Sequence, residues 1–253
     1  MAGFGFVRGC GGVFSIRRAT ACARRSASSL VGSSAMATIL PSHPRLADAK
    51  LYSDLMEEIK IRITAINLGT SGQLWMLPGQ IIREFCFLQI RLICELVALG
   101  CLTAHGDLEK VTKLKKMWEA DRIMEELEKL HPDFFPIPVR QEMNTPAKGR
   151  HNIEAIKGRL DKNGLIDLYH ECGSYLHKGS LRNLLNGNSP RLVNFPDITS
   201  RAQKIEDLIS VHAVFMSGGE TVFICVLRSI DDNLKSQTSI AEKRDVPGFG
   251  LQP

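Results

Sequence analysis

The sequence predicts a mainly α-helical protein, in which a helical bundle carries a C-terminal β-hairpin. Apolar residues recur at helical spacing over several long segments. Only 6% of the 253 residues are aromatic, so a core must be built mainly from Leu, Ile and Val, which suits helices packed on helices. Near the C-terminus, two runs rich in β-branched residues flank a Gly-rich turn. The composition, 44% hydrophobic and 23% charged, is that of a globular protein.

The first 35 residues differ from the rest of the chain in charge. They contain five of the 32 basic residues and no acidic one, so 27 basic residues balance 27 acidic residues in the body. Residues 1–35 are predicted to be a disordered leader outside the fold, either an extension before Met36 or a cleavable segment similar in Arg and Ser content to a mitochondrial transit peptide. We expect a cytoplasmic protein, or a mitochondrial one if this leader is a transit peptide. Because the body has no excess of basic charge, RNA is a partner that the sequence allows but does not favour.

The seven cysteines predict neither a metal site nor a disulfide framework. None forms a Cys-x-x-Cys pair, and three of them lie in one apolar segment, where reduced cysteine behaves as a small hydrophobe. A zinc site from His170, Cys172 and His177 would have poor geometry, because positions two apart on a helix point in different directions. We therefore expect no metal, no cofactor and a reducing compartment.

The first two predicted helices cover residues 47–67 and 78–101. Apolar residues of the first recur in steps of three and four, and glycines within residues 68–72 end it. The second is the most apolar part of the chain, but it contains four charged residues, too many for a membrane-spanning helix. It is therefore predicted to be a central buried helix, and we expect no membrane partner.

Glu84, Arg91 and Glu95 share one face of this central helix, at positions i, i+7 and i+11. Two interpretations are open. Arg91 and Glu95 could form an ion pair that supports the helix. Alternatively, a charged seam on so apolar a helix could mark a subunit interface or a site, because unpaired buried charge is costly. All three are candidate binding residues.

A third helix is predicted over residues 107–130, with Asp107 as its N-cap and Pro132 beyond its end. Lysines crowd its first half and acidic residues its second half, opposite to the preference of the helix dipole. Antiparallel pairing with a second copy would place each block beside its complement, which favours a two-fold homodimer. A solvated face is the alternative.

The rest of the chain is predicted to contain a loop, two helices, a hairpin and a tail. Prolines predict a loop over residues 131–150, and helices are predicted over 165–178 and 198–210. The β-branched runs on either side of Ser217-Gly218-Gly219-Glu220 predict a hairpin at about 211–228. Residues 36–230 thus form a single predicted helical domain. Residues 231–253 have too little apolar content to order and are predicted to be a disordered tail.

A polar stripe on the predicted helix 165–178 is the candidate site. His170, Ser174 and His177 stand at i, i+4 and i+7, and we expect them to face packed neighbours. Two imidazoles and a hydroxyl could carry acid–base chemistry near neutral pH. Hydrogen-bonded histidines at a helix contact are the alternative. Gly173 costs about 1 kcal/mol relative to Ala in a helix interior, so it should permit close approach of another helix or a ligand.

Two features resemble the HEPN-like helical superfamily, and more narrowly bacterial members with a terminal hairpin. One is the apolar helix with internal charge, from Arg83 to Glu95. The other is the Ser174-x-x-His177 helix, followed by the basic residues Lys178 and Arg182. The resemblance covers about residues 50–228. It implies a helical bundle, homodimerisation across the site-bearing helices and, in active members, RNA cleavage by an Arg followed four to six residues later by a His.

The sequence departs from this family's pattern at the catalytic motif. No histidine has an arginine at that spacing. If His177 occupies the family's histidine position, it lacks the arginine that would stabilise the phosphate charge of a cleaving transition state. The resemblance therefore implies a non-catalytic, partner-binding member.

Three functions are consistent with these patterns. The leading hypothesis is a non-catalytic, homodimeric binding or regulatory module. The second is a metal-independent ribonuclease that uses His177, and the third is a small-molecule pocket between the central helix and the His170 helix, lined by Cys94 and Tyr169. The candidate catalytic residues are His170, Ser174, His177 and Arg182, and the candidate binding residues are Glu84, Arg91, Glu95, Tyr169 and Lys178.

Overall fold

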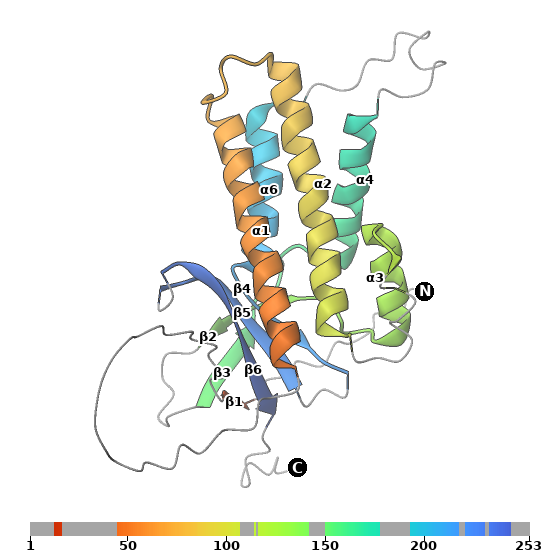
Figure 1. The fold of residues 1–253 in the computed structure, drawn as a ribbon, viewed down its shortest axis with the longest axis vertical. Helices are drawn as coiled ribbons and strands as arrows, with labels where there is room; N and C mark the ends of the chain where they lie inside the picture. The colour runs from red at the N-terminus through yellow and green to blue at the C-terminus, as the bar shows by residue number, and fades with distance from the viewer. Residues whose placement is uncertain are drawn as a thin grey trace, which may run out of the picture.

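The structure is a computed structural model that describes residues 13–16, 45–106, 114, 116–141, 150–177, 193–217, 221–230 and 233–243. Its described part is mainly α-helical, as predicted, with a sheet at one end of a helical bundle (Figure 1). The helices are α1 (Leu46–Thr70), α2 (Gly79–Ala104), α3 (Ala120–Leu130), α4 (Lys162–Leu176) and α6 (Phe195–Ile209).

The long helices form where the sequence supplies an apolar face, and α4 and α6 also have side-chain N-caps. α1 and α2 pack along each other, and α4 and α6 also pack against α2. The Asp161 side chain accepts a hydrogen bond from the Gly164 N–H and begins α4, and the Asn194 side chain caps α6 in the same way through the Asp197 N–H. The helices predicted at 47–67, 78–101, 165–178 and 198–210 are thereby confirmed.

The predicted helix 107–130 is only partly confirmed. α3 begins at Ala120, and residues 117–119 before it are not helical. Residues 107–113 and 115 lie outside the described part, so the lysine block that suggested self-pairing lies mostly outside it too. The acidic block remains at the start and on the outer side of α3.

Glycines let α1 and α2 approach each other closely. A Cβ atom on Gly69 of α1 would lie 2.8 Å from Cys86 Sγ of α2, and one on Gly100 of α2 would lie 3.2 Å from Tyr52 Cε2 of α1. Both positions are buried. Larger residues there would force the two helices apart, because a packed core leaves no free volume.

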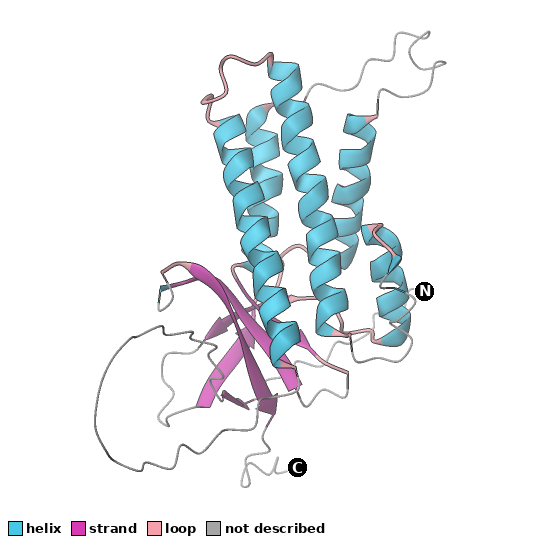
Figure 2. Ribbon diagram, viewed as in Figure 1, coloured by secondary structure: helices cyan, strands magenta, loops and turns pink. Residues whose placement is uncertain are grey.

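The C-terminal β-structure is larger than the predicted hairpin. That hairpin exists as β4 (Val211–Phe215) and β5 (Thr221–Ser229), which pair antiparallel. They belong, however, to a closed six-stranded antiparallel barrel in the order β1-β3-β2-β4-β5-β6 (Figure 2). The additional strands are β1 (Val13–Ile16), β2 (Ile137–Gln141), β3 (Arg150–Ala155) and β6 (Lys235–Lys243).

Three sequence predictions are therefore wrong for these strands. β1 lies in the segment predicted to be a leader outside the fold, and it pairs with β3 and β6. β2 and the first residue of β3 lie in the predicted loop 131–150, and β6 lies in the predicted disordered tail. β6 orders despite its low apolar content because its hydroxyl groups bond to neighbouring elements: Ser53 donates to Thr238 at 2.7 Å, and Ser236 donates to the Leu227 carbonyl at 2.9 Å.

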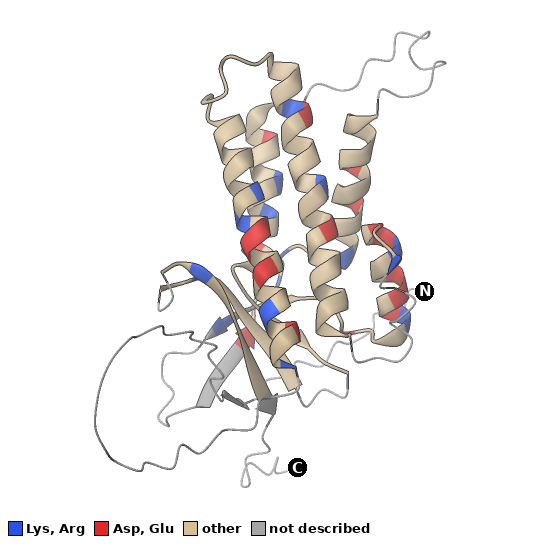
Figure 3. Cartoon of the chain, viewed as in Figure 1, with Lys and Arg blue, Asp and Glu red and all other residues tan. Residues whose placement is uncertain are grey.

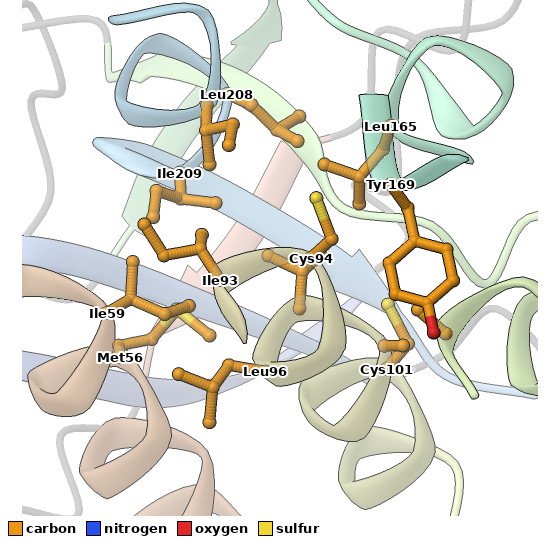
Figure 4. Packing of buried hydrophobic residues seen from close by; sticks show 14 of the residues in the cluster. Met56, Ile59, Ile93, Cys94, Leu96, Cys101, Leu165, Tyr169, Leu208 and Ile209 are labelled. Atoms are coloured by element: carbon orange, nitrogen blue, oxygen red, sulfur yellow. The ribbon is translucent and has the colours of Figure 1, made fainter. Parts of the chain in front are cut away.

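The larger of two apolar clusters joins the bundle to one face of β4 and β5, and the smaller cluster, on the opposite face of these strands, consists of Val139, Ala213, Val222, Ile224 and Ala241. Figure 4 shows the side chains of Met56, Ile59, Ile93, Leu165 and Leu208 converging from α1, α2, α4 and α6. The described cysteines are buried and free, and burial raises the pKa of Cys101 and Cys225 to about 12. They pack as neutral thiols, as expected of small hydrophobic residues.

α2 is the one described helix long and apolar enough to cross a membrane. Within its most apolar window, 61% of the residues are buried inside the protein. A central core helix has this combination of hydropathy and burial, which agrees with the role predicted for this segment.

Candidate functional site

The predicted polar stripe lies on α4 but faces solvent. His170, Ser174 and His177 are all exposed, and His177 is the residue that ends the helix. The Ser174 hydroxyl donates to its own helix, to the carbonyls of His170 at 3.2 Å and Glu171 at 2.9 Å. The expectation that these three groups face packed neighbours is therefore wrong, and no nucleophile–base contact joins Ser174 to either histidine.

His170 has a loose contact with α3. Its Nε2 atom lies 3.6 Å from Asp121 Oδ2, and its ring stands edge-on to Tyr169 with ring centroids 5.7 Å apart. The His170 side chain is 58% exposed, so this contact leaves it largely in water. The other two residues proposed for this region, Lys178 and Arg182, lie outside the described residues.

Three of the four described binding candidates do come together, between α2 and α4. Arg91 donates from Nη2 to the Tyr169 hydroxyl at 2.7 Å, and its guanidinium carbon lies 4.0 Å from the centre of the Tyr169 ring. Its Nε lies 3.5 Å from Glu95 Oε1. Glu84 is separate and accepts a hydrogen bond from Gln80 at 2.8 Å. We call Arg91, Glu95 and Tyr169 the guanidinium cluster.

Burial raises the pKa values of both acidic groups of this cluster. Desolvation raises the pKa of Glu95, and the neighbouring Arg91 opposes that shift. Desolvation likewise raises the pKa of Tyr169, again against Arg91. The tyrosine therefore stays protonated and uses its ring and oxygen to hold the arginine.

Gly173 on α4 is explained by the same cluster. A Cβ atom there would lie 3.0 Å from Arg91 Nη1, so glycine permits close approach of the guanidinium, as predicted. Cys94 is fully buried and Tyr169 is 3% exposed. Both residues that the small-molecule hypothesis assigned to its pocket are thus part of the buried core.

We expect Arg91 and Tyr169 to be energetically coupled. A double-mutant cycle with Arg91→Met, Tyr169→Phe and the double variant should give a coupling free energy of about 1 kcal/mol in urea unfolding, because each single change removes the same charge-assisted hydrogen bond. Met keeps most of the apolar stem on the ring. A coupling energy indistinguishable from zero would show that the contact contributes nothing to stability.

A second polar group, which the sequence analysis missed, joins the bundle to the barrel. His212 on β4 is fully buried, and its Nδ1 lies 2.9 Å from the Ile209 carbonyl. A carbonyl only accepts, so Nδ1 carries the proton and Nε2 accepts from the Tyr52 hydroxyl at 2.7 Å. Nearby, Nε2 atoms of His105 and His131 lie 3.1 and 3.0 Å from the Phe215 carbonyl.

His105 and His212 lie in the interior of the protein and are both 0% exposed, whereas His131 is partly exposed. Within the described part of the chain, every buried side-chain nitrogen and oxygen has a hydrogen-bond partner. Among those same residues, no three His, Cys, Asp or Glu side chains are grouped so that they could hold a metal ion.

Large apolar side chains are exposed at the end of the bundle that lies away from the barrel. Trp75 and Met76, in the connection between α1 and α2, are each 79% exposed. Other large apolar side chains at the end of α1, in the connection and in the first half of α2 are also exposed, and we call the whole set the apolar strip: Leu68, Trp75, Met76, Leu77, Ile81 and Leu88.

All residues of the apolar strip except Leu88 lie in an uncharged stretch of the chain. No charged residue occurs between Arg62 and Arg83, and Figure 3 shows the upper turns of α1 and its connection to α2 without acidic or basic residues. An exposed apolar patch of this kind commonly marks a contact surface. The uncharged run was visible in the sequence, but its exposure was not.

A shallow hollow also lies near this end, beside α6. It is lined by Thr70, Phe195, Pro196, Thr199, Ser200, Gln203, Lys204 and Asp207. Its lining does not include the predicted pocket residues Cys94 and Tyr169.

Comparison of the chain with protein-family models, curated proteins and solved structures gives no match. The resemblance to the HEPN-like superfamily thus stays a prediction from the sequence patterns.

Proposed function

We propose that the protein is a non-catalytic binding module that acts as a homodimer. The single observation that carries this proposal is the apolar strip. Its two most prominent residues, Trp75 and Met76, are four-fifths exposed, and exposed aromatic and Met side chains are enriched at interfaces between proteins. Covering such side chains removes apolar surface from water, which favours association.

The arrangement of the polar residues supports a binding role over catalysis. The guanidinium cluster is internally paired, and the stripe on α4 presents separate side chains to solvent with no described partner for a nucleophile. A serine nucleophile needs a neighbouring base to activate it, and the Ser174 hydroxyl instead donates to carbonyls of its own helix. The HEPN-like resemblance supports the same role, since the chain lacks the arginine of active members.

The ribonuclease remains a second proposal because His170 and His177 are both accessible. They are exposed on one helix, and His170 is beside Asp121, a carboxylate that could orient an imidazole. Incubation of labelled RNA with the pure full chain tests it. Cleavage that disappears in His177→Ala would replace the binding proposal by this one.

The apolar strip gives the direct test of the binding role. We expect light scattering to show a dimer for the full chain and mainly monomer for the Trp75→Ser/Met76→Ser variant, with an unchanged thermal midpoint because both side chains are exposed. Ile230→Ser, a change at an 89% exposed residue in the barrel region, is the matched control and should stay dimeric. A wild-type chain that is monomeric at every concentration would contradict the proposal.

A further inference from the structure

We infer that a second copy of the chain docks on the outer side of α2, with the two α2 helices antiparallel, so that Glu84 of each copy pairs with the partner's Arg91. This inference rests on the proposed homodimeric function and gives it a surface, an orientation and a set of ion pairs. It uses α2, whereas the family resemblance implied dimerisation across the α4 region.

The outer side of α2 is apolar and has no neighbour within the described chain. α1, α3, α4 and α6 pack against its other sides (Figure 1). Ile81 and Leu88 on the outer side are 46% and 42% exposed, and Leu92 beyond them is half-buried. These positions, i, i+7 and i+11, form one straight stripe along a helix.

The charges of α2 are arranged for an antiparallel partner. Glu84 and Arg91 are seven residues apart, which places them about 10 Å apart along the axis and within about 20° of each other around it. A two-fold axis between Phe87 and Leu88 exchanges these two levels. Each Glu84 then lies opposite the partner's Arg91, and two reciprocal ion pairs flank the apolar stripe.

The same axis leaves the two remaining charges of α2 without a like-charged neighbour. Arg83 comes opposite the partner's Leu92, and Glu95 comes opposite the partner's Gln80, whose amide can donate to a carboxylate. In a parallel pair, each charge would face its own copy, and like charges facing each other are destabilising. Charge complementarity therefore selects the antiparallel orientation.

The guanidinium cluster prepares Arg91 for this contact. Tyr169 and Glu95 hold its guanidinium in place, while its side chain remains 24% exposed. Less side-chain freedom is lost when a group already held in position binds a partner. The same axis brings Gly79, where α2 begins, to the level of the partner's Leu96, so that the apolar connection before α2 lies toward the C-terminal half of the opposite α2.

Disulfide cross-linking tests the position of the two-fold axis. Leu88→Cys is made in the full chain with Cys10 and Cys22 replaced by Ser, and this background alone serves as the control without an added thiol. Because Leu88 lies next to the axis, mild oxidation should convert most of the protein to a covalent dimer. Leu51→Cys is the matched control: the native side chain is 51% exposed, and the next residue, Tyr52, packs against Gly100 of α2. It should not cross-link, since the antiparallel pair separates its two copies by about 30 Å or more.

Charge reversal tests the ion pairs. Glu84→Arg should weaken dimerisation at least about tenfold, because it replaces two opposite-charge contacts by two like-charge ones, and Glu84→Gln should weaken it less. Glu125→Arg, the same charge change at an exposed position on α3, should leave the dimerisation constant unchanged. Equal thermal midpoints among the variants would confirm that folding is intact.

The outcomes separate this inference from the function on which it rests. A dimer that does not cross-link through Leu88→Cys, or that cross-links through Leu51→Cys, overturns the α2 interface and leaves the binding module standing. A monomeric wild-type chain overturns both. Insensitivity of the dimer to Glu84→Arg overturns the paired-charge geometry.

Discussion

A chain that ends at Ile230 should fail to fold. It lacks β6, which pairs with β5 from Thr221↔Glu242 to Ser229↔Lys235 and closes the barrel against β1. Its removal would leave β5 as an open edge and would uncover buried apolar side chains of the barrel, among them Val222 and Phe223. We expect a loss of more than about 5 kcal/mol, comparable to the whole stability of a domain.

β6 is also the strand that joins the barrel to α1. Ser53 of α1 donates to Thr238, the Glu57 carboxylate accepts from the Ser236 N–H, and Lys60 donates to the Leu234 carbonyl at 2.7 Å. Circular dichroism and urea unfolding of the two truncated chains provide the measurement. A chain that ends at Lys243 keeps all these contacts and should unfold as the full chain does. A cooperative transition for the chain ending at Ile230 would show that β6 is dispensable.

Strand β6 shows why the sheet was harder to predict than the helices. Its only fully apolar buried side chains are Ile240 and Ala241, so its composition is that of a polar tail. Its order comes from backbone pairing with β5 and from hydroxyl contacts with α1, which depend on residues about 180 positions earlier. No local pattern contains that information.

The prolines near β2 are the reason that this strand was wrongly predicted to be a loop. Pro136 and Pro138 are typical of a loop, yet Pro138 pairs with His212 of β4. Proline lacks an N–H donor but keeps its carbonyl, and here that carbonyl accepts from Ile156 at 2.8 Å. In contrast, the apolar periodicity of α1, α2, α4 and α6 is a property of each segment alone, which is why those helices could be predicted.

The candidate site was partly predictable. Spacing alone places Arg91 and Glu95 on one helix face, and their contact is present at 3.5 Å. That Tyr169 completes the cluster could not be known, because it comes from a helix 78 residues away. The outward direction of His170 was available from α4 itself, whose Leu165, Leu168 and Cys172 form the buried face. Because the apolar face of α4 packs against the core, the polar stripe that contains His170 faces solvent.

Acid should destabilise the fold through His212. Burial lowers the pKa of this histidine to about 4, although the hydrogen bond to the Ile209 carbonyl acts in the opposite direction. Above about pH 6.5, the usual histidine pKa, both the folded and the unfolded chain hold it neutral. Between about pH 6.5 and 4 the unfolded chain binds a proton that the folded chain excludes, so stability falls as the pH falls. The loss reaches about 3 kcal/mol at the lower end of this window.

Urea unfolding at several pH values between 7.5 and 4 measures this loss. The His212→Asn variant cannot take up the proton, and its amide oxygen can still accept from the Tyr52 hydroxyl. The free energy of unfolding of the wild-type chain should therefore fall by about 3 kcal/mol more than that of His212→Asn across the window. Identical pH dependences would show that His212 is protonated in the folded protein. In that case His212 would carry a proton on Nε2 as well as on Nδ1. Nε2 would then donate to the Tyr52 hydroxyl oxygen, the reverse of the direction assigned above.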